Sequence, residues 1–285
     1  MPEGDTIFRT ARSLDRALAG KHITGFRSEC PLLTRFHDDS PIIGRTVERV
    51  ESRGKWLLIH FSGGATLVTH MLMSGSWHIY KPRERWQRSP SAARIVLESC
   101  DYHAVAFDVP VAEMLTDKAL ARDTRIPPQT HDLLSADFDA EAAVKRIMAL
   151  PGEELGSVLL RQQVMAGVGN VFKSEICFAA GLNPFCTVAT LSRDQVANVI
   201  AIARRQLGSN VLEDSPSAFV TWRGTGRRTT RQSDPSANLW VYSRQGQPCR
   251  KCAEPIRARM QGPDARFTFW CPRCQTLPGA SNINI

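Results

Sequence analysis

Hydrophobic residues near the N-terminus recur at every third or fourth position, which is the spacing of one face of an α-helix. The pattern consists of Ile7, Phe8, Ala11, Leu14 and Leu18. Arginine and aspartate residues lie between them, and Gly20 follows the last one. A glycine directly after such a run is typical of a helix end. The sequence therefore predicts an amphipathic helix over about residues 3–19, with Pro2 and Glu3 at its start.

Between Val47 and Val109 the hydrophobic period changes to two, which is typical of β-strands with one buried face. Turn signals such as the Ser62-Gly63-Gly64 segment separate the runs. We expect strands over residues 47–50, 56–61, 67–71, 95–97 and 104–107. Short successive strands of this kind favour an antiparallel β-sandwich.

Helical spacing returns after the breaker cluster at residues 126–128. Helices are predicted over residues 140–150, 153–165, 171–180 and 193–208. Ser192 and Gln195 have the spacing of a capping box, and Gly181 ends the third helix. The second part of the chain is therefore expected to be helical.

Four cysteines near the C-terminus form two Cys-x-x-Cys pairs, namely Cys249 with Cys252 and Cys271 with Cys274. Two such turns on a β-hairpin present four thiolates to one ion, which is the ligand set of a structural zinc site with no open position. The alternative is two disulfides, but loops this short gain little from closure. The other cysteines (Cys30, Cys100, Cys177, Cys186) are scattered, and we expect them to be small buried hydrophobic residues without a function.

These patterns predict a multidomain α+β protein. We expect an N-terminal β-sandwich domain with flanking helices over residues 1–125, a helical domain over 126–245, a zinc-binding β-hairpin over 246–275 and a tail over 276–285.

Charge adds a moderate indication of the partner. The 285 residues contain 36 Lys and Arg against 28 Asp and Glu, which gives a net charge of +8 and a pI near 9.3. This excess favours a polyanion such as nucleic acid. A signal segment is absent from the N-terminal residues, and no apolar run approaches the roughly 20 residues that a membrane span requires. We expect a cytoplasmic protein that acts as a monomer.

The segment from Ala166 to Asn170 contains two glycines between predicted helices. Asn170 is expected to cap the following helix, whose free amide groups could bind a phosphate. Glycine turns between helices are also commonly plain connectors, so this segment alone does not decide between the two interpretations.

Several separated segments together resemble the formamidopyrimidine-DNA glycosylase/endonuclease VIII family of DNA repair enzymes. The matching segments, in chain order, are Met1 to Gly4, Ser52 to Leu58, Gln162 with Ala166 to Asn170, Val241 to Cys249, and Arg266 to Cys274. The resemblance covers nearly the whole chain. It implies a helix-two-turn-helix DNA-binding domain, a zinc finger with one structural zinc, and damaged DNA as the partner.

The resemblance also implies roles for residues near the N-terminus. After removal of Met1, Pro2 would attack the sugar C1′ of a damaged nucleoside and form an iminium, and Glu3 would be the general acid and base. Elimination of both flanking phosphates would follow. Taken alone, Pro2 and Glu3 are also typical of an ordinary helix start.

Further residues match the family's DNA contacts. Lys55 would approach a phosphate and support catalysis, as would Arg266 at the hairpin tip, while Gln162, Gly169 and Asn170 would bind the backbone. Met73 would enter the gap left by the everted base, or else be ordinary strand core. The basic stretch from Arg223 to Arg231 could close over an extruded nucleotide, or be a solvated loop.

Two departures from the family pattern affect the specific function. Asp5 and Thr6 stand where a second glutamate is often found. Residues 108–114 lack the Arg and Phe of the oxidised-purine loop, which favours the endonuclease VIII branch. We therefore expect a glycosylase and AP lyase that removes oxidised pyrimidines by β,δ-elimination. The alternatives are an oxidised-purine glycosylase and a non-catalytic, zinc-containing nucleic-acid-binding protein. The preferred lesion, the use of duplex or single-stranded DNA, and the extent of Met1 removal stay open.

Overall fold

The computed structural model describes residues 2–211, 227–230 and 234–277. They form two compact units, the first containing residues 2–127 and the second the remaining described residues. No helix in these ranges is long and apolar enough to span a bilayer. Each unit has its own hydrophobic core. The division of the chain into four parts, made above, stays a prediction.

The first unit is a sandwich of two four-stranded antiparallel sheets. Their strand orders are β1-β6-β7-β5 and β2-β3-β4-β8. The strands are β1 (Gly25–Ser28), β2 (Val47–Arg53), β3 (Trp56–Phe61), β4 (Ala65–His70), β5 (Ser76–Tyr80), β6 (Ala93–Glu98), β7 (His103–Phe107) and β8 (Val111–Thr116). The buried indole of Trp77 donates a hydrogen bond to the Thr69 hydroxyl at 3.2 Å and so joins the two sheets. The predicted β-sandwich is confirmed.

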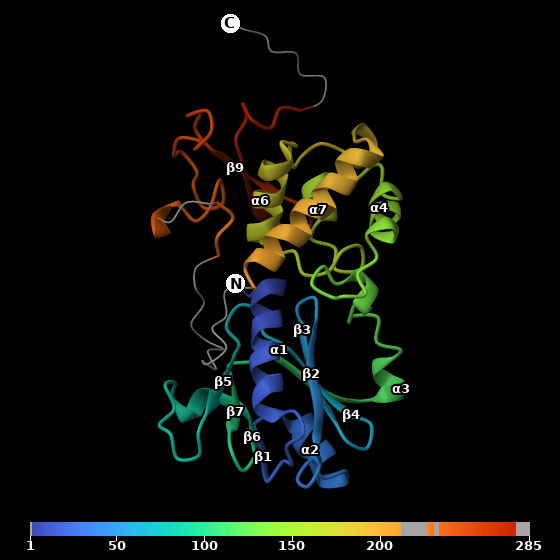
Figure 1. The fold of residues 1–285 in the computed structure, drawn as a ribbon, viewed down its shortest axis with the longest axis vertical. Helices are drawn as coiled ribbons and strands as arrows, with labels where there is room; N and C mark the ends of the chain where they lie inside the picture. Colours follow the sequence, from blue (N-terminus) through green and yellow to red (C-terminus); the bar gives the residue numbers. More distant parts are fainter. Residues whose placement is uncertain (1, 212–226, 231–233, 278–285) are drawn as a thin grey trace, which may run out of the picture. The chain divides into compact units, whose positions relative to one another are not determined.

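Helix α1 (Gly4–Leu18) lies along β2 and β3 of the first unit (Figure 1). Ile7, Leu14 and Leu18 on its apolar face are at most 1% exposed. The carboxylate of Asp15 accepts a hydrogen bond from the amide of Val50 on β2 at 2.7 Å, which fixes the helix to the sheet. The predicted N-terminal helix is confirmed, and its first residue directly follows Glu3.

Several elements of the first unit were not predicted. They are β1, β5, β8, the helix α2 (Pro31–Asp39) and the short helix α3 (Asp117–Leu120). Residues 108–114, interpreted above as part of a loop, largely belong to β8, which pairs with β4. The expectation that Cys100 is buried is wrong, because it lies in the exposed turn between β6 and β7.

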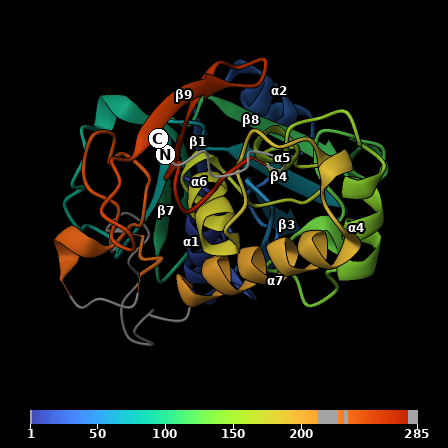
Figure 2. The ribbon, with the colours of Figure 1, turned by 90° about the horizontal axis from the view of Figure 1, so that it is seen from above.

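The second unit consists of helices and one β-hairpin. The helices are α4 (Ala140–Met148), α5 (Leu155–Val158), α6 (Asn170–Ala180) and α7 (Arg193–Ser209). Helix α7 packs beside both α4 and α6 (Figure 2). Ser192 and Gln195 form the predicted capping box of α7, and Gly181 ends α6 with a φ of 69°. The hairpin consists of strands β9 (Arg257–Gln261) and β10 (Arg266–Trp270), and β10 packs on α6.

The helix predicted over residues 153–165 is wrong in length, since only α5 forms there. The side-chain amide of Gln162 donates to the carbonyl groups of Leu160 and Val168 at 2.9 and 3.0 Å, and its oxygen accepts from the amide of Gly167. A side chain that takes up backbone groups in this way competes with the helical hydrogen-bond ladder. Hydrophobic residues keep their helical spacing past residue 158, but the helix itself ends there.

A buried carboxylate connects α6 to the segment before the cysteines. Glu175 is completely buried and accepts hydrogen bonds from the amides of Trp240, Val241 and Tyr242 at 2.8–2.9 Å, and from the Thr229 hydroxyl. These bonds satisfy both oxygens of the carboxyl group inside the protein. They hold the segment before the four cysteines on α6.

Candidate functional site

The N-terminal residues combine a partly exposed proline with buried carboxyl groups. Pro2 is half-buried, whereas Glu3 and Asp5 are both 0% exposed. Glu3 is the N-cap of α1, and its carbonyl accepts from the amides of Thr6 and Ile7 at 3.0 and 3.1 Å. The backbone of Glu3 is therefore held by the helix start, next to the residue whose nitrogen becomes an amine when Met1 is removed. Met1 itself lies outside the described residues.

Lys55 lies in the two-residue turn that joins β2 and β3. Arg53 pairs with Trp56 across this turn, and Gly54 supplies the positive φ of 61°. Glycine in the first central position is typical of a tight hairpin turn, which places the next side chain at the tip. Lys55 is half-buried there.

The structure adds His70, a residue to which the sequence analysis gave no role. His70 ends β4 and pairs with Trp56. Burial and the nearby charge of Lys55 lower the pKa of His70, so the ring is neutral at physiological pH. The only signal in the sequence was a polar residue at the end of an apolar strand, directly before the Met71-Leu72-Met73 segment.

The turn after β4 exposes two large apolar side chains. Met73 is 67% exposed and Leu72 is 47% exposed, whereas Met71 is buried. Leu72 has a φ of 44°, and Gly75 approaches the chain so closely that a Cβ would lie 2.8 Å from the carbonyl oxygen of Met71. The backbone thus turns sharply enough to point Met73 away from the core. Met73 is not part of the strand core.

A partly buried chain of polar side chains follows this turn along the sequence. The Ser76 hydroxyl contacts the His78 ring at 3.0 Å, and the other ring nitrogen contacts the Tyr80 hydroxyl at 2.8 Å. Arg88 donates to the Ser76 hydroxyl at 3.1 Å and pairs with Asp108. Burial, followed by the charge of Arg88, lowers the pKa of His78 to about 4.

We expect the His78 ring to stay neutral on acidification until pH is close to 4. The unfolded chain takes up this proton near pH 6.5, so the contribution to stability is complete above that value and is lost as the pH falls toward 4. NMR titration of the ring nitrogens measures the pKa directly. Denaturant unfolding between pH 7 and 4 should show a weaker pH dependence for His78→Asn than for the wild type. A ring that titrates above pH 6 would contradict this prediction.

In the second unit, the glycine segment, α6 and the hairpin tip come together. Gly169 is the N-cap of α6 and Asn170 is its first residue, so the prediction that Asn170 caps the helix is wrong. Its side-chain amide instead donates to the carbonyl of Phe267 on β10 at 2.9 Å, while its buried carbonyl oxygen has no protein partner in the described structure. Gln162 holds the loop before α6 through Gly167.

Arg266 begins β10, one residue before the Asn170 contact. It pairs with Asp264 at 3.2 Å, and its side chain is 37% exposed. Two further bonds hold β10 on α6, from the buried ammonium of Lys173 to the Thr268 hydroxyl and from the amide of Phe269 to the Ser174 hydroxyl. The structure thus brings Gln162, Gly169, Asn170 and Arg266 into one group in the second unit. Pro2, Glu3, Lys55 and Met73 belong to the first unit.

The four cysteines gather at the base of the hairpin. Their Sγ atoms all lie within 4.8 Å of one another, and none is in a disulfide. The Cys249–Cys274 and Cys252–Cys271 sulfur distances are 3.9 and 3.4 Å. Four sulfurs bound tetrahedrally at about 2.3 Å from zinc would be roughly 3.8 Å apart, so the cluster fits this ion. Free thiols at these distances do not support the alternative of two disulfides.

Most of the basic stretch from Arg223 to Arg231 lies outside the described residues. Of its described part, Arg227 stacks over the Phe172 ring at 5.5 Å, and Arg228 donates to the Asn238 side chain at 3.1 Å. Cys177 and Cys186 are buried in the core of the second unit, as expected. Burial raises the pKa of the Cys177 thiol to about 12, which makes it unreactive.

Comparison with known proteins gives two family matches. The model of the formamidopyrimidine-DNA glycosylase N-terminal domain matches residues 1–110, and that of the H2TH domain of the same enzymes matches residues 130–218. Among solved structures, a complex of Lactococcus lactis Fpg with DNA containing an abasic site superimposes with a TM-score of 0.78. It covers 96% of this chain and all of that one, at 20% identity, and supports the fold.

Similar curated proteins extend over the same length. A probable endonuclease 8 from Streptomyces coelicolor is 36% identical over 98% of this chain and 95% of its own. A DNA-(apurinic or apyrimidinic site) lyase Nei2 from Mycolicibacterium smegmatis is 37% identical over 97% and 99%. Endonuclease 8 from Escherichia coli is 28% identical over 96% and 100%. The family models and these relatives show that the chain belongs to the formamidopyrimidine-DNA glycosylase family, together with the endonuclease 8 proteins.

Proposed function

We propose that this chain excises oxidised pyrimidines from DNA through an imine at Pro2 and cuts the strand by β,δ-elimination. Membership in the family makes it a DNA repair glycosylase with AP lyase activity of the endonuclease 8 type. The proposed imine chemistry rests mainly on one observation, the fully buried Glu3 next to the half-buried Pro2 at the start of α1. We further propose that the protein acts as a monomer in the cytoplasm.

The proposed chemistry begins with the secondary amine of Pro2. Its lone pair attacks the sugar C1′, and the bond from C1′ to the base breaks with its electron pair leaving on the base. Glu3 supplies the proton that this departure requires. The attached nitrogen then loses its one proton, and its lone pair forms the C=N bond as the C1′–O4′ bond breaks and O4′ takes up a proton. The result is a charged iminium, which forms without loss of a second proton from nitrogen and makes the C2′ proton acidic. Its removal expels the 3′ phosphate, and a second elimination expels the 5′ phosphate.

A carboxyl group held at a fixed place beside the attacking amine suits this task, because it can donate and accept a proton there. Asp5 is as deeply buried as Glu3 and lies two residues further along the chain. We propose that Asp5 takes the part of the second glutamate found in many family members. An Asp5→Asn protein would then lose part of the lyase rate.

Lys55 and Arg266 are proposed to bind phosphates, together with Gly169 and Asn170 at the start of α6. Helix starts offer unpaired amide groups to anions, and Lys and Arg add charge. The side-chain NH2 of Asn170 has two N–H groups and gives one to the carbonyl of Phe267, so we assign the phosphate contact to the other. We assign Gln162 a supporting role, since its side chain bonds to backbone groups of Leu160, Gly167 and Val168 and so holds the loop before α6.

We expect the charged and uncharged phosphate contacts to differ in salt dependence. Lys55→Ala and Arg266→Ala should each weaken binding to duplex DNA and reduce the slope of log affinity against log salt by roughly one unit. Asn170→Ala should weaken binding with little change in slope, because it releases no counterion. Fluorescence anisotropy from low to moderate salt measures both quantities.

The exposed Lys118, on α3, provides a matched control for loss of one positive charge. Lys118→Ala should keep the wild-type slope and single-turnover rate. An Arg266→Ala protein with both values unchanged would show that the hairpin is a structural appendage, and would refute its proposed role.

The proposed lesion class rests on the segment after β7. Residues 108–114 contain neither Arg nor Phe, and most of them belong to the edge strand β8. A paired strand leaves little freedom for a loop that would enclose an oxidised purine. We propose Met73, and with it Leu72, as the apolar wedge that fills the gap beside an everted pyrimidine. Single-turnover excision of thymine glycol and of 8-oxoguanine tests the proposed lesion class. Faster excision of 8-oxoguanine would favour an oxidised-purine glycosylase.

Zinc is the metal that the four cysteines are proposed to hold, as one structural ion. Four thiolates leave no position for a water or substrate, so the ion would organise the hairpin and take no part in the chemistry. A second candidate function, a binding protein without catalysis, would keep this site and the phosphate contacts. It would not form a covalent bond with DNA.

A further inference from the structure

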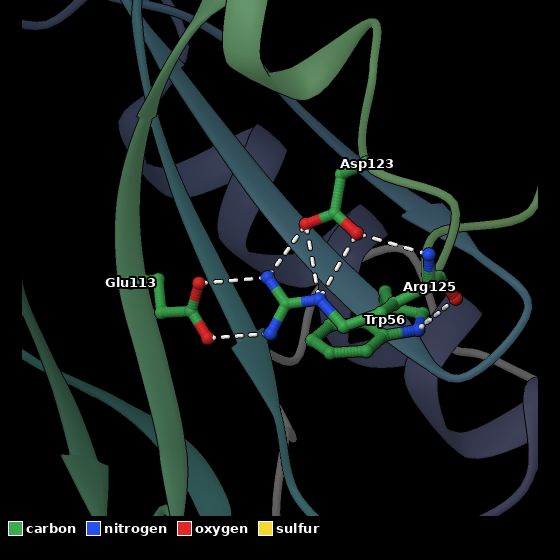
Figure 3. A network of polar contacts seen from close by, with 4 residues as sticks. All are labelled: Trp56, Glu113, Asp123 and Arg125. Atoms are coloured by element: carbon green, nitrogen blue, oxygen red, sulfur yellow. Dashed lines mark hydrogen bonds and ion pairs between the residues drawn. The ribbon is translucent and has the colours of Figure 1, made fainter.

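An arginine clasp holds the end of the first unit on the edge of its sheet (Figure 3). The guanidinium of Arg125 donates two hydrogen bonds to the Glu113 carboxylate on β8, at 2.8 and 2.7 Å, and further bonds to Asp123 at 2.6 and 3.0 Å. A single exposed ion pair contributes little to stability. Two parallel hydrogen bonds from one guanidinium to one carboxylate, within a larger network, restrain the arginine side chain. Arg125 lies two residues before the end of the unit at Pro127.

The same arginine holds Trp56 from two directions. Its guanidinium lies over the indole ring, 5.7 Å from the centroid, and its backbone carbonyl accepts from the indole N–H at 3.1 Å. Trp56 directly follows Lys55 at the start of β3. The position of the indole is therefore set by the segment that ends the first unit.

Trp56 in turn contacts His70 on the neighbouring strand. The two rings meet edge to face, with centroids 4.9 Å apart and an interplanar angle of 78°. The Nδ1 atom of His70 accepts a hydrogen bond from the amide of Leu72 at 3.1 Å. A nitrogen that accepts has no proton, so the neutral ring carries its proton on Nε2. Protonation of Nδ1 would remove this bond.

The bond to His70 matters because the turn it holds is strained. Leu72 has a φ of 44°, a conformation that costs a non-glycine residue about 1–2 kcal/mol. Such backbone persists only where the surroundings fix it. His70 does this on one side of the turn, and on the other the Ser74 hydroxyl donates to the carbonyl of Asp108 at 3.2 Å.

We propose that Arg125, Trp56 and His70 are positioning residues that hold the turn from Leu72 to Ser74, and so place Leu72 and Met73 for insertion beside an everted nucleotide. These three residues form a relay of contacts from Arg125 through Trp56 to His70. The relay also links the turn to the segment that ends the first unit at Pro127. The inference rests on the proposed function. It adds that insertion of the wedge depends on the Nδ1 acceptor of His70 and on the hydrogen bonds of the Arg125 guanidinium.

The test compares two substitutions of His70. His70→Leu removes the acceptor, whereas His70→Asn offers a side-chain oxygen to the amide two residues ahead, as asparagine does in many turns. The readout is the fluorescence of 2-aminopurine placed beside a stable abasic analogue in duplex DNA, which rises when a wedge unstacks it. Single-turnover excision of thymine glycol and cleavage at a preformed abasic site are measured in parallel.

We expect His70→Leu to abolish most of the fluorescence rise and to slow excision by roughly tenfold or more, since small displacements near reacting groups have large effects on rate. Cleavage at a preformed abasic site, where no base is everted, should change much less. His70→Asn should restore the fluorescence rise and most of the excision rate. Equal losses in both variants would overturn the proposal, because the hydrogen bond would then not be the decisive feature.

Arg125→Gln tests the other end of the relay, with Arg122→Gln as its matched control in the same segment. Arg122 is exposed and has no hydrogen bond from its side chain among the described contacts. Arg125→Gln should reduce the fluorescence rise, Arg122→Gln should not, and the double variant of Arg125→Gln with His70→Leu should lose no more than His70→Leu alone. Additive losses would show two independent effects and refute the relay.

Failure of the inference can be told apart from failure of the proposed function. Wild-type protein that becomes covalently trapped on abasic DNA by borohydride, with variants that insert normally, would overturn only the relay. Wild-type protein that cannot be trapped would overturn the function itself. Circular dichroism during heating verifies that each variant is folded.

Discussion

Glu3→Gln is expected to slow base excision by about 10²–10⁴-fold, which is the usual contribution of a general acid or base. Glu3 is completely buried at the N-cap of α1, and glutamine has nearly the same shape but cannot transfer a proton. The loss should therefore be one of rate, with little change in DNA affinity. Cleavage at a preformed abasic site should decline less, because the base is already absent. Single-turnover kinetics on a thymine-glycol duplex and on abasic DNA measure the two steps.

The Pro2→Gly variant tests the role of the amine separately from that of the proton donor. Glycine still offers a primary amine after Met1 removal, so imine formation should slow without disappearing.

The matched control for Glu3→Gln is Glu48→Gln on the exposed face of β2, which should behave as wild type. Wild-type excision by the Glu3→Gln protein would refute the assignment of Glu3.

Loss of the metal is expected to have the second largest effect. Cys274→Ser should lower the zinc content from one ion per chain to none and remove most DNA affinity, because structural zinc supplies much of the folding free energy of such small modules. Contacts from Asn170, Lys173 and Ser174 hold β10 on α6, but the base of the hairpin depends on the cysteines. The first unit should stay folded, since it has its own core.

Elemental analysis, anisotropy and limited proteolysis measure the three parts of this prediction. Cys100→Ser is the matched control, because Cys100 is an exposed cysteine far along the chain from the cluster and should leave zinc and affinity unchanged. Full DNA affinity in a Cys274→Ser protein verified to be zinc-free would contradict the proposed role of the hairpin tip.

Local periodicity predicted much of the fold. The helix at residues 4–18, most strands of the sandwich and the capping box at Ser192 follow from patterns within about 20 residues, where neighbouring positions share one environment. The gathering of the four cysteines was equally predictable, because two Cys-x-x-Cys pairs have the fixed spacing of a metal-binding cluster. In each case the information is contained in one short stretch of sequence.

Specific side-chain contacts, which hydrophobic periodicity does not report, explain what could not be predicted. The helix over residues 153–165 stops early because Gln162 takes up carbonyl groups of its own loop. Asn170 has the residue type and position of a cap, but a carbonyl on β10 lies within its reach. His70 became a candidate only when the pairing of β3 with β4 placed it beside Trp56 and Lys55.

The most direct test of the account is identification of the nucleophile. The protein is incubated with duplex DNA that contains an abasic site, sodium borohydride is added, and the cross-linked peptide is identified by mass spectrometry. The account predicts a stable covalent complex in which the DNA sugar is attached to the nitrogen of Pro2, in molecules that lack Met1. Absence of a trapped complex in protein verified to begin with Pro2, or attachment to a lysine such as Lys55, would contradict it.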